Sequence, residues 1–237
     1  MKNLVGICVL LLGFQTNLVQ AQSSRLNAFW FDINPRYSFN QKLEMRGDVA
    51  YRIIPEEDLQ SVIIRPVLAW FPSSIFNFRF GVGYFYTDSD QTFNDKELRG
   101  HQAMNIRWPQ IVGIEFAHRF QVEERFIYDD SRELYDFVSR GRYRLRVSSP
   151  DFGIFGSQRK FYGTSSLEFL VNFNPTDVLA VDYQDRLTLG LGYRWTTRFR
   201  VEFHYQSHGS RFNFSDGFSV NENIWRWRFF YRINELE

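Results

Sequence analysis

Cysteine, lysine and long apolar runs are what this sequence largely lacks. Its 237 residues include one cysteine, Cys8, so no disulfide framework holds the fold together. The mean hydropathy of −0.35 argues against a bundle of membrane helices, which would need several stretches of about 20 mostly apolar residues. Only four of the 28 basic residues are lysines, so arginine carries almost all of the positive charge.

An excess of one charge sign is also missing. The 28 basic and 27 acidic residues give a formal net charge of +1, so no global field directs the chain to nucleic acid. Aromatic residues, in contrast, make up 19% of the chain, beside 23% charged residues. A chain this aromatic is not intrinsically disordered. Its stability must come from a sheet or a core.

The first 21 residues have the layout of a secretory signal peptide. Lys2 precedes an apolar run from Leu4 to Phe14, and the segment ends on the small residue Ala21. We expect cleavage after Ala21, which divides the chain into a signal peptide (1–21) and a mature domain (22–237). A short buried core helix is the alternative for this segment. Cleavage would remove Cys8 and leave an exported domain without cysteine.

The mature domain shows a hydrophobic period of two, which is typical of β-strands. Between residues 75 and 87 the even positions are apolar and the odd positions are polar or glycine, as in Phe78, Arg79 and Phe80. We expect no helix after residue 21. The same alternation predicts eleven strands, at residues 28–39, 42–53, 61–71, 75–87, 98–108, 114–126, 135–147, 162–173, 186–195, 197–206 and 223–233.

The connections between these strands alternate in length. Short turns are expected at 40–41, 72–74, 109–110 and 196–197, and long polar loops at 54–60, 88–97, 128–134, 174–185 and 207–222. Short turns at one rim and long loops at the other are typical of bacterial outer-membrane barrels. Because such barrels usually have an even number of strands, either a further strand lies in 150–162 or 178–183, or the amino end enters through the lumen.

The arginines test the barrel interpretation independently, because the strand phase is chosen from the apolar residues alone. Twenty arginines fall on the polar phase and none falls on the apolar phase. A soluble sandwich would turn the aromatic phase into a core, whereas a membrane barrel turns it to lipid and the polar phase to a lumen. The signal peptide, the loop lengths and strands of ten or more residues favour the barrel. Tryptophans expected at the strand ends would form an interfacial belt, and they are Trp70, Trp108, Trp195, Trp225 and Trp227.

The sequence therefore predicts an all-β protein, an antiparallel transmembrane β-barrel of roughly ten to twelve strands preceded by a cleaved signal peptide. Four segments carry a family resemblance: residues 97–107, 118–126 (HRFQVEERF), 140–145 (RGRYRL) and 185–193 (DRLTLGLGY). They resemble the Gram-negative outer-membrane family called domain of unknown function 2490, over most of residues 25–235. The resemblance implies an outer-membrane β-barrel with no known activity. Expected partners are outer-membrane lipids, lipopolysaccharide and the barrel-assembly machinery, but no nucleic acid.

The predicted lumen is strongly basic. The inward phase collects many more arginines than acids, and most other acids are expected in loops. Two interpretations remain open: arginine and glutamate side chains plug a structural and binding barrel, or the excess charge makes a narrow pore that prefers small anionic solutes. The candidate lumen residues are Arg119, Glu123, Arg125, Arg140, Arg142, Arg144, Arg146, Arg200, Arg226 and Arg228.

A lipid-modifying hydrolase is the alternative function from another class. His208 and Ser210, with Glu202 nearby, resemble the His-x-Ser motif of outer-membrane lipid A deacylases, in which histidine is the base for a serine nucleophile. Arg211 stands where that motif has asparagine, and the two candidates are expected in a loop. A barrel without enzymatic activity is therefore favoured. The four histidines show no metal-ligand spacing, and no cofactor is predicted.

Overall fold

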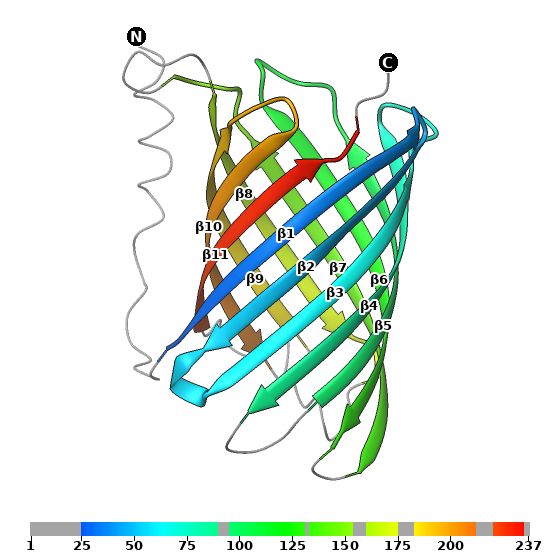
Figure 1. Cartoon of the computed structure of the whole chain (residues 1–237), viewed down its shortest axis with the longest axis vertical. Helices are drawn as coiled ribbons and strands as arrows, with labels where there is room; N and C mark the ends of the chain where they lie inside the picture. Colours follow the sequence, from blue (N-terminus) through cyan, green and yellow to red (C-terminus); the bar gives the residue numbers. More distant parts are fainter. Residues whose placement is uncertain are drawn as a thin grey trace.

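The computed structural model describes residues 25–89, 95–130, 133–153, 160–174, 183–211 and 220–234. Its strands form one closed barrel in which each strand pairs with two neighbours (Figure 1). The predicted signal peptide lies outside the described residues. Among the residues described, no helix is long and apolar enough to cross a membrane.

All eleven predicted strands are confirmed, and most of them extend further than the alternation indicated. They are β1 (Leu26–Asn40), β2 (Leu43–Ile54), β3 (Leu59–Trp70), β4 (Phe76–Ser89), β5 (Asp95–Arg107), β6 (Glu115–Asp129), β7 (Leu134–Ser148), β8 (Phe161–Asn172), β9 (Tyr183–Arg194), β10 (Phe199–Arg211) and β11 (Val220–Arg232). A single 3-10 turn, η1 (Pro55–Glu57), joins β2 to β3. Asn27 donates hydrogen bonds to the Glu56 carboxylate, and these bonds lower the pKa of Glu56.

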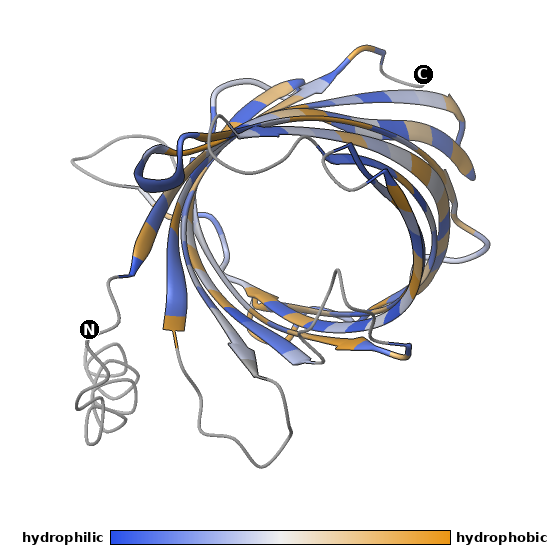
Figure 2. Ribbon diagram, turned by 90° about the horizontal axis from the view of Figure 1, so that it is seen from below, coloured by the Kyte–Doolittle hydropathy of each residue, from blue (hydrophilic) through white to orange (hydrophobic). Residues whose placement is uncertain are grey.

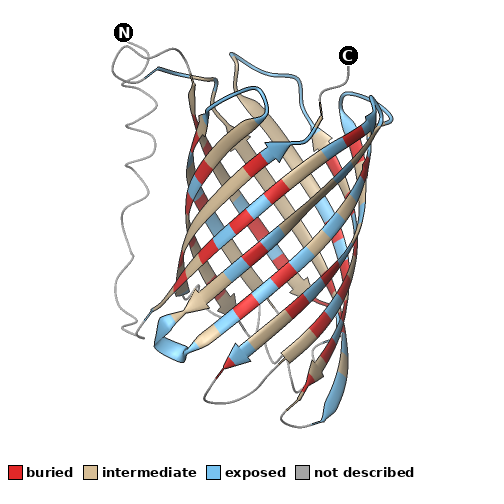
Figure 3. Ribbon diagram, viewed as in Figure 1, coloured by how far each residue is buried: buried red, intermediate tan, exposed pale blue. Residues whose placement is uncertain are grey.

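The barrel is polar inside and apolar outside. Viewed along its axis, the strands form a ring in which hydrophilic and hydrophobic residues alternate (Figure 2), and buried and exposed residues alternate in the same way (Figure 3). Asp32 and Glu123 are completely buried, whereas Ile33 and Val82 are 59% and 53% exposed. Because successive side chains of a strand point to opposite faces, the period of two in the sequence sorts them into a lumen wall and an outer wall.

The barrel closes through a parallel pair. β1 and β11 run parallel, from Leu26 opposite Glu222 to Arg36 opposite Arg232, while the other ten pairs are antiparallel. An odd number of strands connected up and down leaves the first and last strands pointing the same way. The predicted antiparallel pairing therefore holds for ten pairs but not at this seam, and neither a twelfth strand nor entry of the amino end through the lumen is needed. Phe152 forms only an isolated bridge with Phe161, and residues 178–182 lie outside the described residues.

Side chains reinforce this seam. Phe31 of β1 stacks on Trp227 of β11, with ring centroids 5.0 Å apart. Beyond the end of β11, the Asn234 amide group accepts from the Ser38 N–H and donates to the Ser38 carbonyl, both at 2.8 Å. The Asn234 side chain thus continues the hydrogen-bonding pattern of the ladder. Because parallel pairing is slightly weaker per residue than antiparallel pairing, these contacts stabilise the weakest type of junction in the barrel.

The predicted difference between short and long connections is not seen. The upper rim in Figure 1, where β1 ends, carries the connections 41–42, 71–75, 108–114, 149–160 and 195–198; the lower rim carries 55–58, 90–94, 130–133, 173–182 and 212–219. The strands continue into the segments expected as long loops, so the two sets have similar lengths.

Three of the five tryptophans that were predicted at strand ends lie there, all at one rim. Trp70 ends β3, and Trp108 and Trp195 directly follow β5 and β9, so all three lie at the upper rim. Trp225 and Trp227, in contrast, lie inside β11, five or more residues from either end of the strand. Their expected position at a strand end is therefore wrong.

Cysteine cross-linking tests the parallel seam. Ile33 and Phe229 are directly opposite one another and both belong to the outward phase. We expect the double variant Ile33→Cys, Phe229→Cys to form a disulfide on oxidation, detected as a mobility shift that reductant reverses. The control Ile33→Cys, Trp225→Cys separates the thiols by four residues, roughly 13 Å along β11, which exceeds disulfide reach. Equal cross-linking of both pairs, or of neither, would contradict the parallel seam.

Candidate functional site

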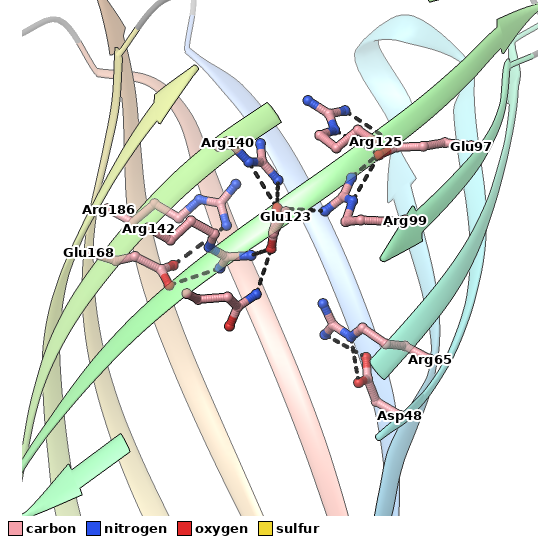
Figure 4. A network of polar contacts seen from close by, with 11 residues as sticks. Asp48, Arg65, Glu97, Arg99, Glu123, Arg125, Arg140, Arg142, Glu168 and Arg186 are labelled. Carbon is pink, nitrogen blue, oxygen red and sulfur yellow. Dashed lines mark hydrogen bonds and ion pairs between the residues drawn. The ribbon is translucent and has the colours of Figure 1, made fainter. Parts of the chain in front are cut away.

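Glu123 lies at the centre of a network of ion pairs on the lumen wall (Figure 4). Its side chain is completely buried. Arg140 donates to it from Nε and Nη2 at 2.9 and 2.5 Å, Arg142 Nη1 binds the second oxygen, and Gln121 donates at 2.7 Å. Arg99 lies 3.6 Å away. A buried carboxylate is stable only when cations and hydrogen-bond donors compensate its lost hydration, and here they surround it.

Glu97 and Glu168 extend this central network along the wall. Arg99 and Arg125 each donate two hydrogen bonds to the Glu97 carboxylate, from Nε and Nη2, at 2.7 to 2.9 Å. Arg142 Nη2 donates to Glu168 at 2.8 Å, and Arg186 lies 3.7 Å from the other oxygen of Glu168. Arg142 therefore bridges Glu123 and Glu168, and the planar guanidinium fork directs its two Nη groups at the two acids.

A second network, which we call the seam network, centres on Glu202 of β10 and Asp32 of β1. Tyr162 donates to Glu202 at 2.8 Å, and Arg228 lies 3.6 Å from Glu202 and 3.4 Å from Asp32. Both carboxylates are completely buried. Arg228 thus connects the two acids across the parallel junction of β11 with β1. The remaining groups around them are the arginines Arg146 and Arg200 and the imidazole of His204 at Glu202, and Arg226 at Asp32.

Two inward-facing aromatic rings pack against arginine side chains of the lumen wall. The sequence pattern did not predict these inward rings. The guanidinium of Arg52 lies 3.8 Å from the ring centroid of Trp30, and that of Arg99 lies 4.0 Å from Phe85. A guanidinium over an aromatic face gains cation–π attraction without a carboxylate. We had expected the aromatic residues to face outward, but Trp30 and Phe85 occupy the polar phase of their strands and are buried.

The structure divides the ten predicted lumen residues into three groups. Glu123, Arg125, Arg140 and Arg142 belong to the central network, and Arg146, Arg200, Arg226 and Arg228 belong to the seam network. Arg119 and Arg144 belong to neither and have no ion pair with a carboxylate among the described residues.

Glu97 and Glu222 are lumen acids that we had assigned to loops. Glu97 is buried in β5, and Glu222 of β11 pairs with His208 at 3.0 Å. The alternation does continue through Glu97, Arg99 and His101, so extending the predicted strand by one residue would have found Glu97. The excess of positive charge in the lumen is consequently smaller than predicted.

The hydrolase candidates are not brought together. His208 and Ser210 lie in β10. The prediction that both residues lie in a loop is therefore wrong. His208 Nδ1 pairs with Glu222, whereas Ser210 Oγ accepts from Asn221, and Glu202 contacts His204 instead. The described residues contain no hydrogen bond between His208 and Ser210, which a histidine base requires in order to activate a serine.

No group of three or more His, Cys, Asp or Glu side chains suited to a metal ion occurs in the part of the chain that the structure describes.

A closed barrel with a charged lumen and an apolar outer wall is the class of protein that these observations define. The chain belongs to the family described as "Protein of unknown function (DUF2490)", whose model matches residues 27–217. No curated protein and no solved structure matches the chain. Family membership thus confirms the expected resemblance and supplies no activity.

Removing the central carboxylate tests the network. We expect Glu123→Gln to lower the free energy of unfolding by about 3–5 kcal/mol, because it leaves Arg140 buried without its carboxylate and takes one of two carboxylates from Arg142. The measurement is equilibrium urea unfolding followed by tryptophan fluorescence. The control Glu115→Gln breaks an exposed 3.5 Å pair with Arg107 at the upper rim and should cost less than about 1 kcal/mol. Similar losses in both variants would show that the central network does not stabilise the barrel.

Proposed function

We propose that the protein is an outer-membrane β-barrel whose narrow, basic lumen admits small anions. The observation that carries this proposal is the inverted polarity of the fold: completely buried acids such as Glu123 and Glu202 line the inside, and large exposed apolar side chains cover the outside. In water, such a continuous apolar surface would be an aggregation liability. In a bilayer it is the surface that lipid solvates.

The dimensions support membrane insertion. A tilted strand needs about 9–11 residues to cross the hydrocarbon core, and the shortest strands of this barrel, such as β2, have 12. Closure also leaves no strand edge unpaired, which a lipid environment requires because it offers no hydrogen bonds to free backbone groups.

The charges support a preference for anions. Every acid of the central network contacts at least two arginines, so these acids present little free negative charge to a passing ion. Side chains three strands apart also make contact, because Arg146 of β7 donates to Glu202 of β10 at 3.3 Å. A passage lined by arginine favours anions over cations.

The proposal includes the route and the surroundings. Residues 1–21 would direct export as a cleaved signal peptide, the barrel-assembly machinery would insert the mature chain, and lipopolysaccharide and other outer-membrane lipids would contact the outer wall. The three tryptophans of the upper rim, Trp70, Trp108 and Trp195, support an interfacial position for that rim.

An arginine on the outer wall distinguishes lipid from water. Val82 lies near the middle of β4 and is 53% exposed. In water Val82→Arg should be almost neutral, but facing lipid it should cost about 2–4 kcal/mol and reduce the membrane-inserted, heat-modifiable fraction on gels. The control Val112→Arg, at a 90% exposed position in the 108–114 connection, should leave that fraction unchanged. Recovery of the unmodified protein in the soluble periplasmic fraction, or an inserted fraction of Val82→Arg equal to that of the Val112→Arg control, would exclude the membrane proposal.

Ion selectivity tests the lumen directly. We expect the purified protein in planar bilayers to conduct, with a reversal potential in a KCl gradient that shows preference for chloride over potassium. The physical reason is the uncompensated arginine charge of the lumen. A cation-selective conductance would contradict the proposal, and an absence of conductance would favour the structural barrel plugged by its own ion pairs.

A further inference from the structure

Three arginines near the upper rim form what we call the upper arginine cluster: Arg79, Arg119 and Arg144. They extend from β4, β6 and β7, and each lies on the inward phase within five residues of the upper end of its strand. Arg119 and Arg144 are directly opposite one another in the β6–β7 ladder. Arg79 donates to Asn77, which lies directly opposite Asn105 in the β4–β5 ladder, and Asn105 lies directly opposite Arg119 in the β5–β6 ladder. Three positive charges therefore face the same part of the lumen.

No carboxylate forms an ion pair with this cluster among the described residues. The nearest acid in the ladder is Glu168, directly opposite Arg144. Both oxygens of Glu168 already contact other cations, because Arg142 binds one of them and Arg186 lies beside the other. The three guanidinium groups also lie over none of the inward aromatic rings described above. Like charges on adjacent strands repel one another, so the cluster has an unfavourable energy without a counter-charge.

Two buried asparagines orient two of these three guanidinium groups. Arg79 Nε donates to Asn77 Oδ1 at 3.2 Å, and Arg119 Nε donates to Asn105 Oδ1 at 2.9 Å. Asn77 and Asn105 are only 5% and 7% exposed. A neutral amide oxygen orients a guanidinium without cancelling its charge, and it leaves the terminal Nη groups available to another acceptor.

The amide nitrogen of Asn105 provides an independent indication of a ligand. This Nδ2 group is buried and has no hydrogen-bond partner, although its own carbonyl oxygen holds Arg119. Buried donors without an acceptor are uncommon and costly. Asn105 Nδ2 lacks a hydrogen-bond acceptor and Arg119 lacks a counter-charge, and a single anionic oxygen compound bound beside them would supply both.

We propose that the upper arginine cluster and Asn105 form a binding site for a phosphate group, a proposal that rests on the proposed function for access through the lumen. Guanidinium forks from three strands supply paired donors in several directions, which suits the several oxygens of a tetrahedral dianion. Chloride offers no such set of acceptors, and one carboxylate has only two oxygens. The central network cannot provide this site because Glu97, Glu123 and Glu168 already occupy its arginines.

The proposal also explains why arginine stands at positions where its charge opposes folding. Glutamine at position 119 or 144 would keep a hydrogen-bond donor and remove the repulsion. We therefore expect Arg119→Gln and Arg144→Gln to retain or increase resistance to urea, in contrast to a substitution within the central network. A group retained at a cost to stability indicates a role in binding.

The test uses isothermal titration of the full mature chain with inorganic phosphate at constant ionic strength. We expect binding by the unmodified protein, and affinity at least about tenfold lower in Arg119→Gln and Arg144→Gln, since each loses a charge-assisted contact. Asn105→Asp should abolish binding, because its carboxylate would pair with Arg119 and replace the ligand. The matched control Arg194→Gln removes one positive charge from the rim, where Arg194 pairs with Asp151, and should bind like the unmodified protein.

A phosphate group could come from a free solute or from a lipopolysaccharide headgroup, and a second titration separates these sources. Adding lipopolysaccharide to the phosphate-bound protein should not displace phosphate if the lumen takes free solutes. If lipopolysaccharide displaces phosphate from the unmodified protein and does not bind Arg119→Gln in the same way, the site binds the phosphate of the lipopolysaccharide headgroup.

The phosphate site and the pore are tested separately. Unchanged phosphate affinity in Arg119→Gln and Arg144→Gln would overturn the site, even if the bilayer measurements show anion selectivity. Loss of affinity in these variants would support the site, even if the barrel does not conduct. An equal loss in Arg194→Gln would also overturn it, because it would show that general positive charge attracts phosphate.

Discussion

The pairing of buried carboxylates with arginine is the interaction on which this barrel depends. Its interior wall contains acids that no solvent reaches, and an isolated buried charge costs several kcal/mol. Arg142 joins Glu123 to Glu168, and Arg228 joins Asp32 to Glu202. Because a guanidinium presents donors on two edges, one side chain stabilises two acids on different strands. Such paired contacts favour arginine over lysine at these positions.

The seam between the first and last strands also contains a buried carboxylate paired with arginines. An up-and-down arrangement of eleven strands must close with a parallel pair, and here the closing pair is β1 with β11. The seam network lies at this junction, where Asp32 of β1 contacts two arginines of β11. Charged contacts in the lumen and aromatic contacts outside, such as Phe31 on Trp227, therefore reinforce the junction from both faces.

The distribution of acids gives the lumen two parts with different chemistry. Where Glu97, Glu123 and Glu168 stand, the arginines are neutralised and form part of the wall. Where asparagines take the equivalent role, as Asn105 does beside Arg119, the positive charge remains. An acid or an amide next to an arginine thus decides whether that arginine stabilises the fold or is available to a ligand.

The sequence by itself predicted the segments that form the eleven strands, within a total of roughly ten to twelve, together with their approximate ends and the side of the wall that their residues face. These are local properties, because a period of two fixes the orientation of every side chain in a strand. Only the tertiary structure decided which arginines are neutralised. Arg125 reaches Glu97 and Arg146 reaches Glu202 across 28 and 56 residues of sequence, so these pairs depend on strand register. Closure of the ring likewise decided the parallel seam and placed His208 beside Glu222 rather than Ser210, because the pairing of the first and last strands is a property of the whole ring.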